Sequence, residues 1–394
     1  MQTLDPGDPV ALADEVTSRF EQLHGRPPEA VVAAPGRVNL IGEHLDYNGG
    51  LCLPMALPHA TYAAVAPRDD DVVTVTSGQA EGRFEGRLDA LGPDDVSGWA
   101  AYAAGVLWAL REDGWDLPGC DVVVESRVPV GAGLSSSAAI ECSVALGAVT
   151  LAGVEVDDEV RGRLVRACMR AEAEVAGAPT GGMDQTVALL ARADAALLLD
   201  CRDWSTRQVP WAPADAGLAL LVVDTRASHA LTDGGYGARR SDCEEAARRL
   251  GVDLLRDVDD PQAALAELAE DERVQRRVRH VFTELDRVRR TVELLEAGDM
   301  AGTGPLLTAS HLSLRDDYEV SCAELDVVVE TALATGALGA RMTGGGFGGS
   351  AIALVAADAL EDVAAAVCAA YDAHDWPAPG LLTAPPSPGA RRLR

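Results

Sequence analysis

The sequence contains no lysine, so all 33 of its basic residues are arginines. A Walker A phosphate loop, a protein kinase and a pyridoxal enzyme each need a lysine at the reacting centre, which excludes these three classes. Basic residues are also scarce beside 62 acidic ones, and the formal net charge is −29. Nucleic acid and anionic membrane surfaces would both be repelled, so we expect no nucleic acid and no membrane as partner.

Long apolar runs are missing as well. No run approaches the roughly 18 residues that a bilayer-spanning helix needs, and the first residues lack the basic and apolar parts of a secretory signal. We therefore expect a cytoplasmic protein. Its eight cysteines are scattered without a C-x-x-C pair. That pattern is typical of reduced thiols, and we predict neither a disulfide nor a zinc site.

The remaining composition is that of a globular protein, with 48% hydrophobic and 24% charged residues. A chain of 394 residues is long enough for two domains. Periodicity and turn residues predict mixed α and β structure. We expect helices over 9–24, 99–111 and 159–176, and strands over 31–34, 60–66, 72–76, 120–126, 195–200, 218–223 and 351–356. The strand at 31–34 is predicted to end in a turn at Pro35 and Gly36.

We place the domain boundary near residue 205, giving domains of 1–205 and 206–394. The tail from Trp376 is rich in proline and glycine, and its last residues are expected to be loose. The extreme C-terminus is nevertheless a candidate to return to the first domain.

The first segment with chemical character follows the strand at 31–34 and reads PGRVNLIGEHLDYNGG over residues 35–50. Buried charges must be paired or neutralised, so a cluster of arginine, glutamate, histidine and aspartate is unusual for a core. Carboxylates accept hydrogen bonds from sugar hydroxyls, which favours a polyol pocket. The alternative is a solvated loop.

The second segment, PVGAGLSSSAA at 129–139, leads into small apolar helix formers. Backbone N–H groups at that helix start form an anion site without any lysine, and a serine hydroxyl can bind Mg²⁺. A plain serine N-cap is the equal alternative.

The third segment, MTGGGFGGS at 342–350, formally contains G-x-G-x-x-G. The dinucleotide interpretation fails on context, because no obvious strand precedes the glycines and a strand follows where a helix is required. A glycine loop can instead approach a phosphate or the first segment closely, or serve as a structural hairpin.

In this order the three segments resemble the motifs of the GHMP small-molecule kinases. The stretch GRVNLIGEHLDYNGG is similar, almost letter for letter, to the signature of the galactokinase family. GGMDQ at 181–185, YGARRSDCEEAARRLG at 236–251 and SHLSLRDDYEVSCAELD at 310–326 also resemble that family. The resemblance covers nearly the whole chain.

The resemblance implies an α+β fold of two domains, a ribosomal S5 domain 2-like N-terminal domain and a ferredoxin-like C-terminal domain, with the active site between them. It also implies an enzyme that uses ATP and Mg²⁺ to phosphorylate the C1 hydroxyl of α-D-galactose, the first committed step of galactose catabolism. We expect a monomer.

Residue by residue, the resemblance makes Asp184 and Arg37 catalytic. Asp184 would accept the proton of the C1 hydroxyl or orient that hydroxyl, and Arg37 would stabilise the aspartate and the developing charge. The positions that match sugar-binding residues are Arg37, Glu43, His44, Asp46, Gly181, Asp184 and Tyr236. Among them, Asp46 would bind ring hydroxyls and Glu43 the C6 end.

The positions that match ATP-binding residues are Gly131, Gly133, Leu134, Ser135, Ser136, Ser137, Ala138 and Trp99. Ser137 and Glu172 match the Mg²⁺ ligands. Outside the resemblance, Glu172 would be an exposed helix residue and Trp99 a core residue. Gly182 departs from the family, which usually has an aliphatic residue there, so packing under Asp184 is expected to differ.

Two rival functions remain open. A galactose sensor built on the same scaffold usually has a damaged serine-rich segment, which is intact here. A kinase for N-acetylgalactosamine or for several hexoses is the nearer rival.

Overall fold

The computed structural model describes residues 2–178, 180–227 and 235–394. A six-stranded sheet dominates the first half of the chain, in the order β14, β2, β4, β7, β5, β6. Its strands are β2 (Ala30–Asn39), β4 (Pro54–Pro67), β5 (Val72–Ser77), β6 (Arg83–Arg87), β7 (Cys120–Ser126) and β14 (Arg391–Arg392).

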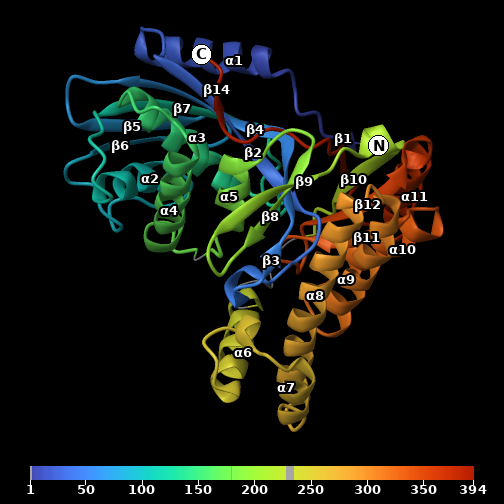
Figure 1. The fold of residues 1–394 in the computed structure, drawn as a ribbon. Helices are drawn as coiled ribbons and strands as arrows, with labels where there is room; N and C mark the ends of the chain where they lie inside the picture. Colours follow the sequence, from blue (N-terminus) through green and yellow to red (C-terminus); the bar gives the residue numbers. More distant parts are fainter. Residues whose placement is uncertain (1, 179, 228–234) are drawn as a thin grey trace.

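Helices cover both faces of this sheet (Figure 1). Helix α1 (Pro9–His24) packs on one face, and α2 (Ala100–Glu112), α3 (Ser136–Leu151), α4 (Asp158–Glu174) and α5 (Met183–Leu190) lie on the other. Alternate residues of β2 therefore enter two different cores: Val31 packs with α1, and Val32 packs with α2 and α3. Burial on both faces explains why this strand is apolar at almost every position.

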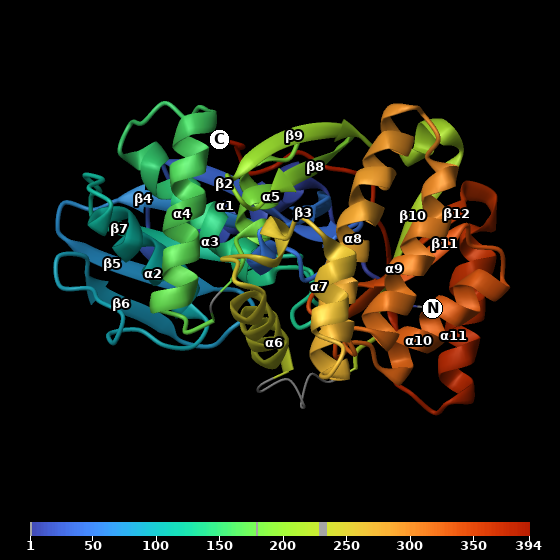
Figure 2. The same cartoon turned by 60° about the horizontal axis from the view of Figure 1, so that its bottom comes forward.

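The second half builds a five-stranded sheet in the order β1, β13, β10, β12, β11. Its strands are β1 (Gln2–Thr3), β10 (Leu218–Asp224), β11 (Gly339–Thr343), β12 (Ser350–Ala356) and β13 (Gly380–Thr383). The helices of this half are α6 (Gly235–Leu250), α7 (Pro261–Glu267), α8 (Glu272–Glu296), α9 (Gly304–Asp316), α10 (Ala323–Ala334) and α11 (Leu360–Ala373). Figure 2 shows α8 at the junction of the two halves, with α9, α10 and α11 beyond it.

A third, three-stranded sheet of β3 (Leu51–Cys52), β8 (Ala195–Asp200) and β9 (Ser205–Pro210) lies between the two large sheets (Figure 2). The largest apolar core is continuous through this junction. It contains Leu40, Ile41 and Leu45 of the first segment together with residues of α8, β11 and β12. The segment between β2 and β3 is therefore packed from both halves.

Helices and sheets occur in both halves, which confirms the predicted α+β class. The predicted helices and strands are all present, and most agree with the structure to within about two residues. Two strands are longer than predicted: β4 begins at Pro54 rather than near residue 60, and β2 does not end before Pro35 but continues to Asn39, with an irregularity in its pairing to β4 between Pro35 and Arg37. The bulge keeps the strand paired where a turn was expected.

Two further expectations were wrong. The glycine loop does have a strand before it, because β11 pairs with β12 as an antiparallel hairpin. The last residues are not loose: β14 pairs with β2, and Arg394 forms an ion pair with Asp14. Backbone hydrogen bonds to β2 outweigh the local preference of a proline- and glycine-rich tail for irregular structure.

The two ends of the chain lie in opposite halves. Strand β1 pairs with β13 in the second sheet, and β14 pairs with β2 in the first. Among the helices that the structure describes, none has the length and apolar character needed to cross a membrane.

Candidate active site

The three segments singled out in the sequence meet at the junction of the two halves. Gly344, in the loop of the β11–β12 hairpin, donates its backbone N–H to Glu43 Oε1 at 2.8 Å. Ser350 at the other end of that loop donates to the carbonyl of Ala132 in the second segment at 2.7 Å. The glycine loop therefore approaches the other two segments closely, as one of the two interpretations of its sequence predicted.

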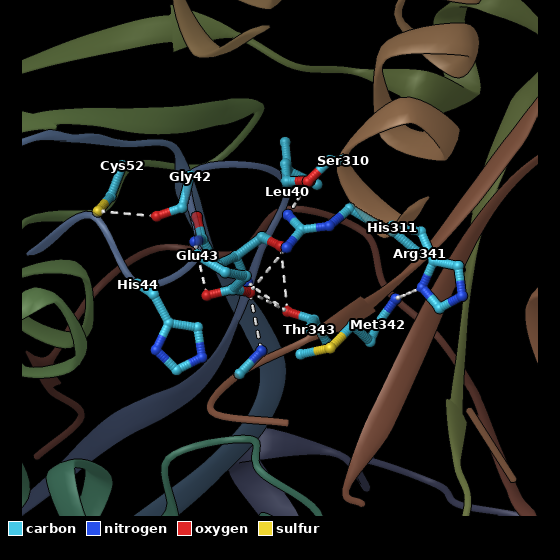
Figure 3. Close-up of polar contacts among 12 residues, drawn as sticks. Leu40, Gly42, Glu43, His44, Cys52, Ser310, His311, Arg341, Met342 and Thr343 are labelled. Atoms are coloured by element: carbon cyan, nitrogen blue, oxygen red, sulfur yellow. Dashed lines mark hydrogen bonds and ion pairs between the residues drawn. The ribbon is translucent and has the colours of Figure 1, made fainter. Parts of the chain in front are cut away.

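The first segment is buried rather than a solvated loop, and side chains of the second half hold its backbone. Arg341 on β11 donates to the carbonyl of Leu40 at 2.8 Å (Figure 3). The backbone N–H of Gly42 donates to Glu284 on α8 at 3.0 Å. Burial opposes ionisation of Glu284, but the charges of Arg287 and Arg341 and other neighbouring groups together outweigh it and lower the pKa of that carboxyl to about 2. The anchor for Gly42 is thus a carboxylate at neutral pH.

Glu43 is 2% exposed, and the protein itself supplies most of its hydrogen bonds. Its Oε1 accepts from the Thr343 hydroxyl at 3.1 Å and from Gly344 N–H, and lies 3.4 Å from the Arg341 guanidinium (Figure 3). Its Oε2 accepts from Asn39 at 3.0 Å. Glu43 therefore joins β2 to the hairpin across the junction.

His44 is a neutral imidazole, because burial lowers its pKa to about 3. Its Nε2 lies 3.1 Å from the carbonyl of Gly345, and because a carbonyl only accepts, Nε2 carries the proton. Its Nδ1 then accepts from the Tyr47 hydroxyl at 2.9 Å. Tyr318, buried in the second half, completes the chain by donating to the Tyr47 hydroxyl oxygen at 2.8 Å. One tautomer of His44 is thereby selected.

Arg37 and Asp184 form a bidentate ion pair at the junction of the two halves. Arg37 Nε donates to Asp184 Oδ1 at 2.8 Å, and Nη2 donates to Oδ2 at 2.9 Å. The third guanidinium nitrogen, Nη1, donates to the carbonyl of Gly133 at 2.6 Å. Arg37 therefore binds both Asp184 and the second segment, so the position of Asp184 is coupled to that of the second segment.

Ser135 lies directly before α3 but does not act as its cap, because its side chain makes no hydrogen bond to the first turn of the helix. Its hydroxyl donates instead to Asp184 Oδ2. The backbone of Ser135 has a φ of 60°. The plain N-cap interpretation is therefore wrong for this serine.

Glu172 on α4 is a buried carboxyl, not an exposed helix residue, with 8% of its surface accessible. It accepts hydrogen bonds from the Ser137 hydroxyl and, at 2.5 Å, from Gln185 Nε2. Burial and then the charge of Asp184 raise the pKa of Glu172 to about 7. Gln185 also donates to a second buried carboxyl, Glu141, at 3.1 Å. Burial and the proximity of Glu172 raise the Glu141 pKa well above its usual range.

A cavity of about 240 Å³ opens in front of these groups. Its wall contains seven of the predicted site residues, namely Arg37, Glu43, His44, Asp46, Glu172, Asp184 and Tyr236. The wall carries four carboxyls, those of Glu43, Asp46, Glu172 and Asp184, but only one guanidinium, that of Arg37. The cavity is therefore rich in hydrogen-bond acceptors. Burial and then the charges of Asp184 and Glu43 raise the pKa of Asp46 to about 6.

Gly181 fits the site because of its missing side chain. A Cβ placed there would lie 1.8 Å from Asp46 Oδ2 and 2.3 Å from its Cγ. The backbone of residue 181 therefore touches the carboxylate of Asp46 directly, and a glycine is required for this approach.

The remaining predicted residues belong to the second segment or lie apart. Gly133 and Leu134 bind Arg37 through their carbonyls, and Ser136 and Ala138 lie in the first turn of α3. Gly131 lies at the start of the same loop, in the wall of a different cavity. Trp99 is the N-cap residue of α2 and packs against the apolar core between the first sheet and helices α2, α3 and α4. It is not part of the wall of the 240 Å³ cavity.

Sequence reasoning missed the residues that hold the site from behind. Glu284, Arg341, Tyr318 and Glu141 are all buried polar residues with contacts in the site. Arg341 lies in β11, a strand that the sequence pattern did not predict, and Glu284 lies in a helix dense in charges. Only their burial, which is a property of the fold, distinguishes them from exposed neighbours.

Three family models match the chain. The N-terminal domain of GHMP kinases matches residues 101–192 and the C-terminal domain matches residues 291–373. A mevalonate kinase structure has the same fold, with a TM-score of 0.62 at 15% identity over 92% of this chain and 98% of that one. The fold is thus that of the GHMP small-molecule kinases, and membership of a kinase family implies the use of ATP.

The galactose-binding signature of galactokinases matches residues 18–67. The galactokinase of Streptomyces coelicolor is 53% identical over 97% of this chain and 99% of its own length, and that of Mycobacterium tuberculosis is 46% identical over 92% and 98%. The structure of Lactococcus lactis galactokinase complexed with galactose has a TM-score of 0.91 at 32% identity, covering 97% of this chain and all of that one. The chain belongs to the galactokinase family.

Proposed function

We propose that this protein transfers the γ-phosphoryl group of Mg·ATP to the C1 hydroxyl of α-D-galactose, giving α-D-galactose 1-phosphate and ADP. This reaction is the entry step of galactose catabolism by the Leloir pathway. The observation that carries the proposal is the Asp184 carboxylate, which is fixed by Arg37 and Ser135 on the wall of a cavity rich in carboxylates. Similarity to a galactokinase complexed with galactose supports the choice of sugar.

Asp184 is suited to bind one hydroxyl. A carboxylate has about four acceptor positions, and Arg37 and Ser135 occupy three of them. The remaining position accepts a hydrogen bond from the C1 hydroxyl and orients its oxygen for in-line attack, or takes its proton as the bond to phosphorus forms. The adjacent guanidinium of Arg37 stabilises negative charge that develops on the transferred group.

The sugar is bound by the acceptors of the first segment. Asp46 accepts from ring hydroxyls, and Tyr236 covers the same cavity from α6. Glu43 Oε2 has Asn39 as its protein donor, so it retains capacity for a hydroxyl at the C6 end. His44 donates to Gly345 and so shapes the wall between the first segment and the hairpin.

The phosphates are assigned to residues 131–138 of the second segment. No lysine is available, but the start of α3 presents backbone N–H groups that the side chain of Ser135 does not cap. Trp99 is assigned to the adenine on the resemblance alone.

Ser137 and Glu172 fit a divalent cation. Both side chains are hard oxygen donors, and they are hydrogen-bonded to each other. The pKa of Glu172 is raised because burial and the charge of Asp184 disfavour its ionised form. A cation at this position relieves both effects. Two protein ligands are the number that Mg²⁺ typically takes when it also binds phosphates, and when bound it neutralises charge on the phosphate oxygens.

The test is ADP release with Mg·ATP and D-galactose, compared with D-glucose and N-acetylgalactosamine, for the wild type and for Asp184→Ala. We expect fast turnover with galactose and its loss in the variant. Galactose binding without ADP release would instead identify a sensor. Faster turnover with N-acetylgalactosamine or glucose would retain the fold and replace the substrate.

A further inference from the structure

The backbone that leads into α5 is enclosed from two sides. Gly181 touches the Asp46 carboxylate on the side of the cavity, and Gly182 is in contact with Met169 and Trp204 on the other side. A Cβ at Gly182 would lie 2.5 Å from Met169 Sδ and 2.6 Å from Trp204 Cη2. These two side chains therefore rest directly on the Gly182 backbone, two residues before Asp184.

Trp204 reaches this position from the turn between β8 and β9. Its φ is 62°, a left-handed conformation that costs a bulky residue free energy, and its indole is still 43% exposed. Its backbone N–H closes the turn on the carbonyl of Asp200 at 2.9 Å. Trp204 belongs to none of the described apolar cores, and its contact with Gly182 links it to the backbone before Asp184.

Gly182 is the N-cap residue of α5 and its φ is 80°. Its carbonyl is fixed from the helix side, accepting from the Thr186 hydroxyl at 2.7 Å and from the Thr186 N–H at 3.1 Å. Its Cα has no side chain to hold it on the opposite side. Met169 and Trp204 supply that support, on the wall of a second, mostly apolar cavity of about 440 Å³ behind α5.

We propose that Trp204, together with Met169, is a positioning residue for Asp184. It sets where α5 begins and thereby fixes the carboxylate that is bound by Arg37 at 2.8 and 2.9 Å. Without the indole, the glycine can move into the vacated space, and the first turn of α5 moves with it. A misplacement on the order of 1 Å at a reacting group costs up to about 10²-fold in rate. This inference rests on the proposed function of Asp184.

The test compares Trp204→Ala with Trp115→Ala, a matched loss of an indole that packs on Arg163 at the surface of the same half. ADP release with galactose gives kcat and KM, and calorimetric titration with galactose gives the number of sites per chain. We expect kcat of Trp204→Ala to fall about tenfold, with one galactose still bound per chain, and Trp115→Ala to stay within twofold of the wild type. Met169→Leu, which keeps the volume but moves the contact, should lie between them.

Three results would overturn the proposal: an unchanged kcat in both Trp204→Ala and Met169→Leu, a loss of kcat matched by an equal loss of binding sites, or the same loss in Trp115→Ala. If Trp204→Ala does not fold, Met169→Leu decides alone. The wild type separates this inference from the proposed function. A wild type that releases no ADP with galactose contradicts the function, whereas an active wild type with an unchanged kcat in both Trp204→Ala and Met169→Leu contradicts only the inference.

Discussion

Replacing Gly181 by alanine should disable the sugar site while leaving the fold intact. The φ of Gly181 is outside the left-handed region, so an alanine is compatible with its backbone and lowers the entropy of the unfolded chain. The new methyl group, however, would lie 1.8 Å from Asp46 Oδ2, where ordinary contacts begin near 3.4 Å. The carboxylate must therefore withdraw by about 1.6 Å, which is enough to break any hydrogen bond that it makes to a sugar hydroxyl.

The size of the effect follows from the interaction that is lost. A hydrogen bond to a charged group contributes about 1.5 to 3 kcal/mol, which corresponds to a loss of roughly 10- to 150-fold in kcat/KM for galactose. We expect most of the loss in KM for galactose, with little change in KM for ATP. The assay is ADP release at saturating Mg·ATP with galactose varied, beside a thermal melt that should shift by no more than a few degrees.

Gly162→Ala is the matched control, because Gly162 lies within α4 with open space around it. It should leave the kinetics unchanged and stabilise the helix by about 0.5 to 1 kcal/mol. A folded Gly181→Ala enzyme with KM for galactose within twofold of the wild type would refute the reasoning. So would a double variant Asp46→Ala and Gly181→Ala that is much worse than Asp46→Ala alone, because the two changes should act on the same group.

Four further predictions concern the charged groups of the site and the sheet that carries Arg37. Because the pKa of Asp46 is raised to about 6, galactose binding measured without nucleotide should weaken up to tenfold per pH unit below that value and level off above it, and Asp46→Asn should remove this dependence. The raised pKa also means that Asp46 favours the folded state at low pH, and this contribution should be lost as the pH rises through about 6. Arg37→Lys cannot form the bidentate pair with Asp184, so kcat should fall on the order of 10- to 100-fold in steady-state assays while the melting temperature changes little. Removal of residues 386–394 takes away β14 and its hydrogen bonds to β2, and should lower the melting temperature by more than about 5 °C in a calorimetric scan.

The parts of the site that were predictable are those written in contiguous motifs. Arg37 and Asp46 lie in a segment whose residues indicate a polar pocket, whereas Asp184 was singled out only by the family resemblance of GGMDQ; the structure brings all three to one cavity. Burial distinguishes Glu172 from an ordinary helix glutamate, and no local pattern shows this. Periodicity predicted mixed α and β structure and most of the elements, because each depends on neighbours close in sequence, whereas the two-domain α+β fold was implied by the family resemblance.

The supports of the site were not predictable because they act over long sequence separations. Glu284 binds Gly42 from a helix more than 240 residues away, and Arg341 in the unpredicted β11 binds Leu40. The packing of Trp204 on Gly182 depends on a turn whose sequence carries no signal of its partner. The composition of the tail predicted irregular structure. The tail is ordered because β14 pairs with the edge of β2. In each case the deciding interaction is tertiary, and local preference carries no information about it.

The pairing of β14 with β2 has a consequence for how the protein is made. The other five strands of the first sheet are complete once residue 126 has been synthesised, but β14 begins at residue 391. At 5 to 20 residues per second, the ribosome needs roughly 15 to 50 s to reach it. During that time the outer edge of β2, the strand that carries Arg37, lacks its final partner and is exposed to pairing with other chains. We therefore expect nascent chains stalled before residue 385 to bind chaperones and to aggregate more readily than chains that include β14, because the edge of β2 is covered only when residues 391–392 pair with it.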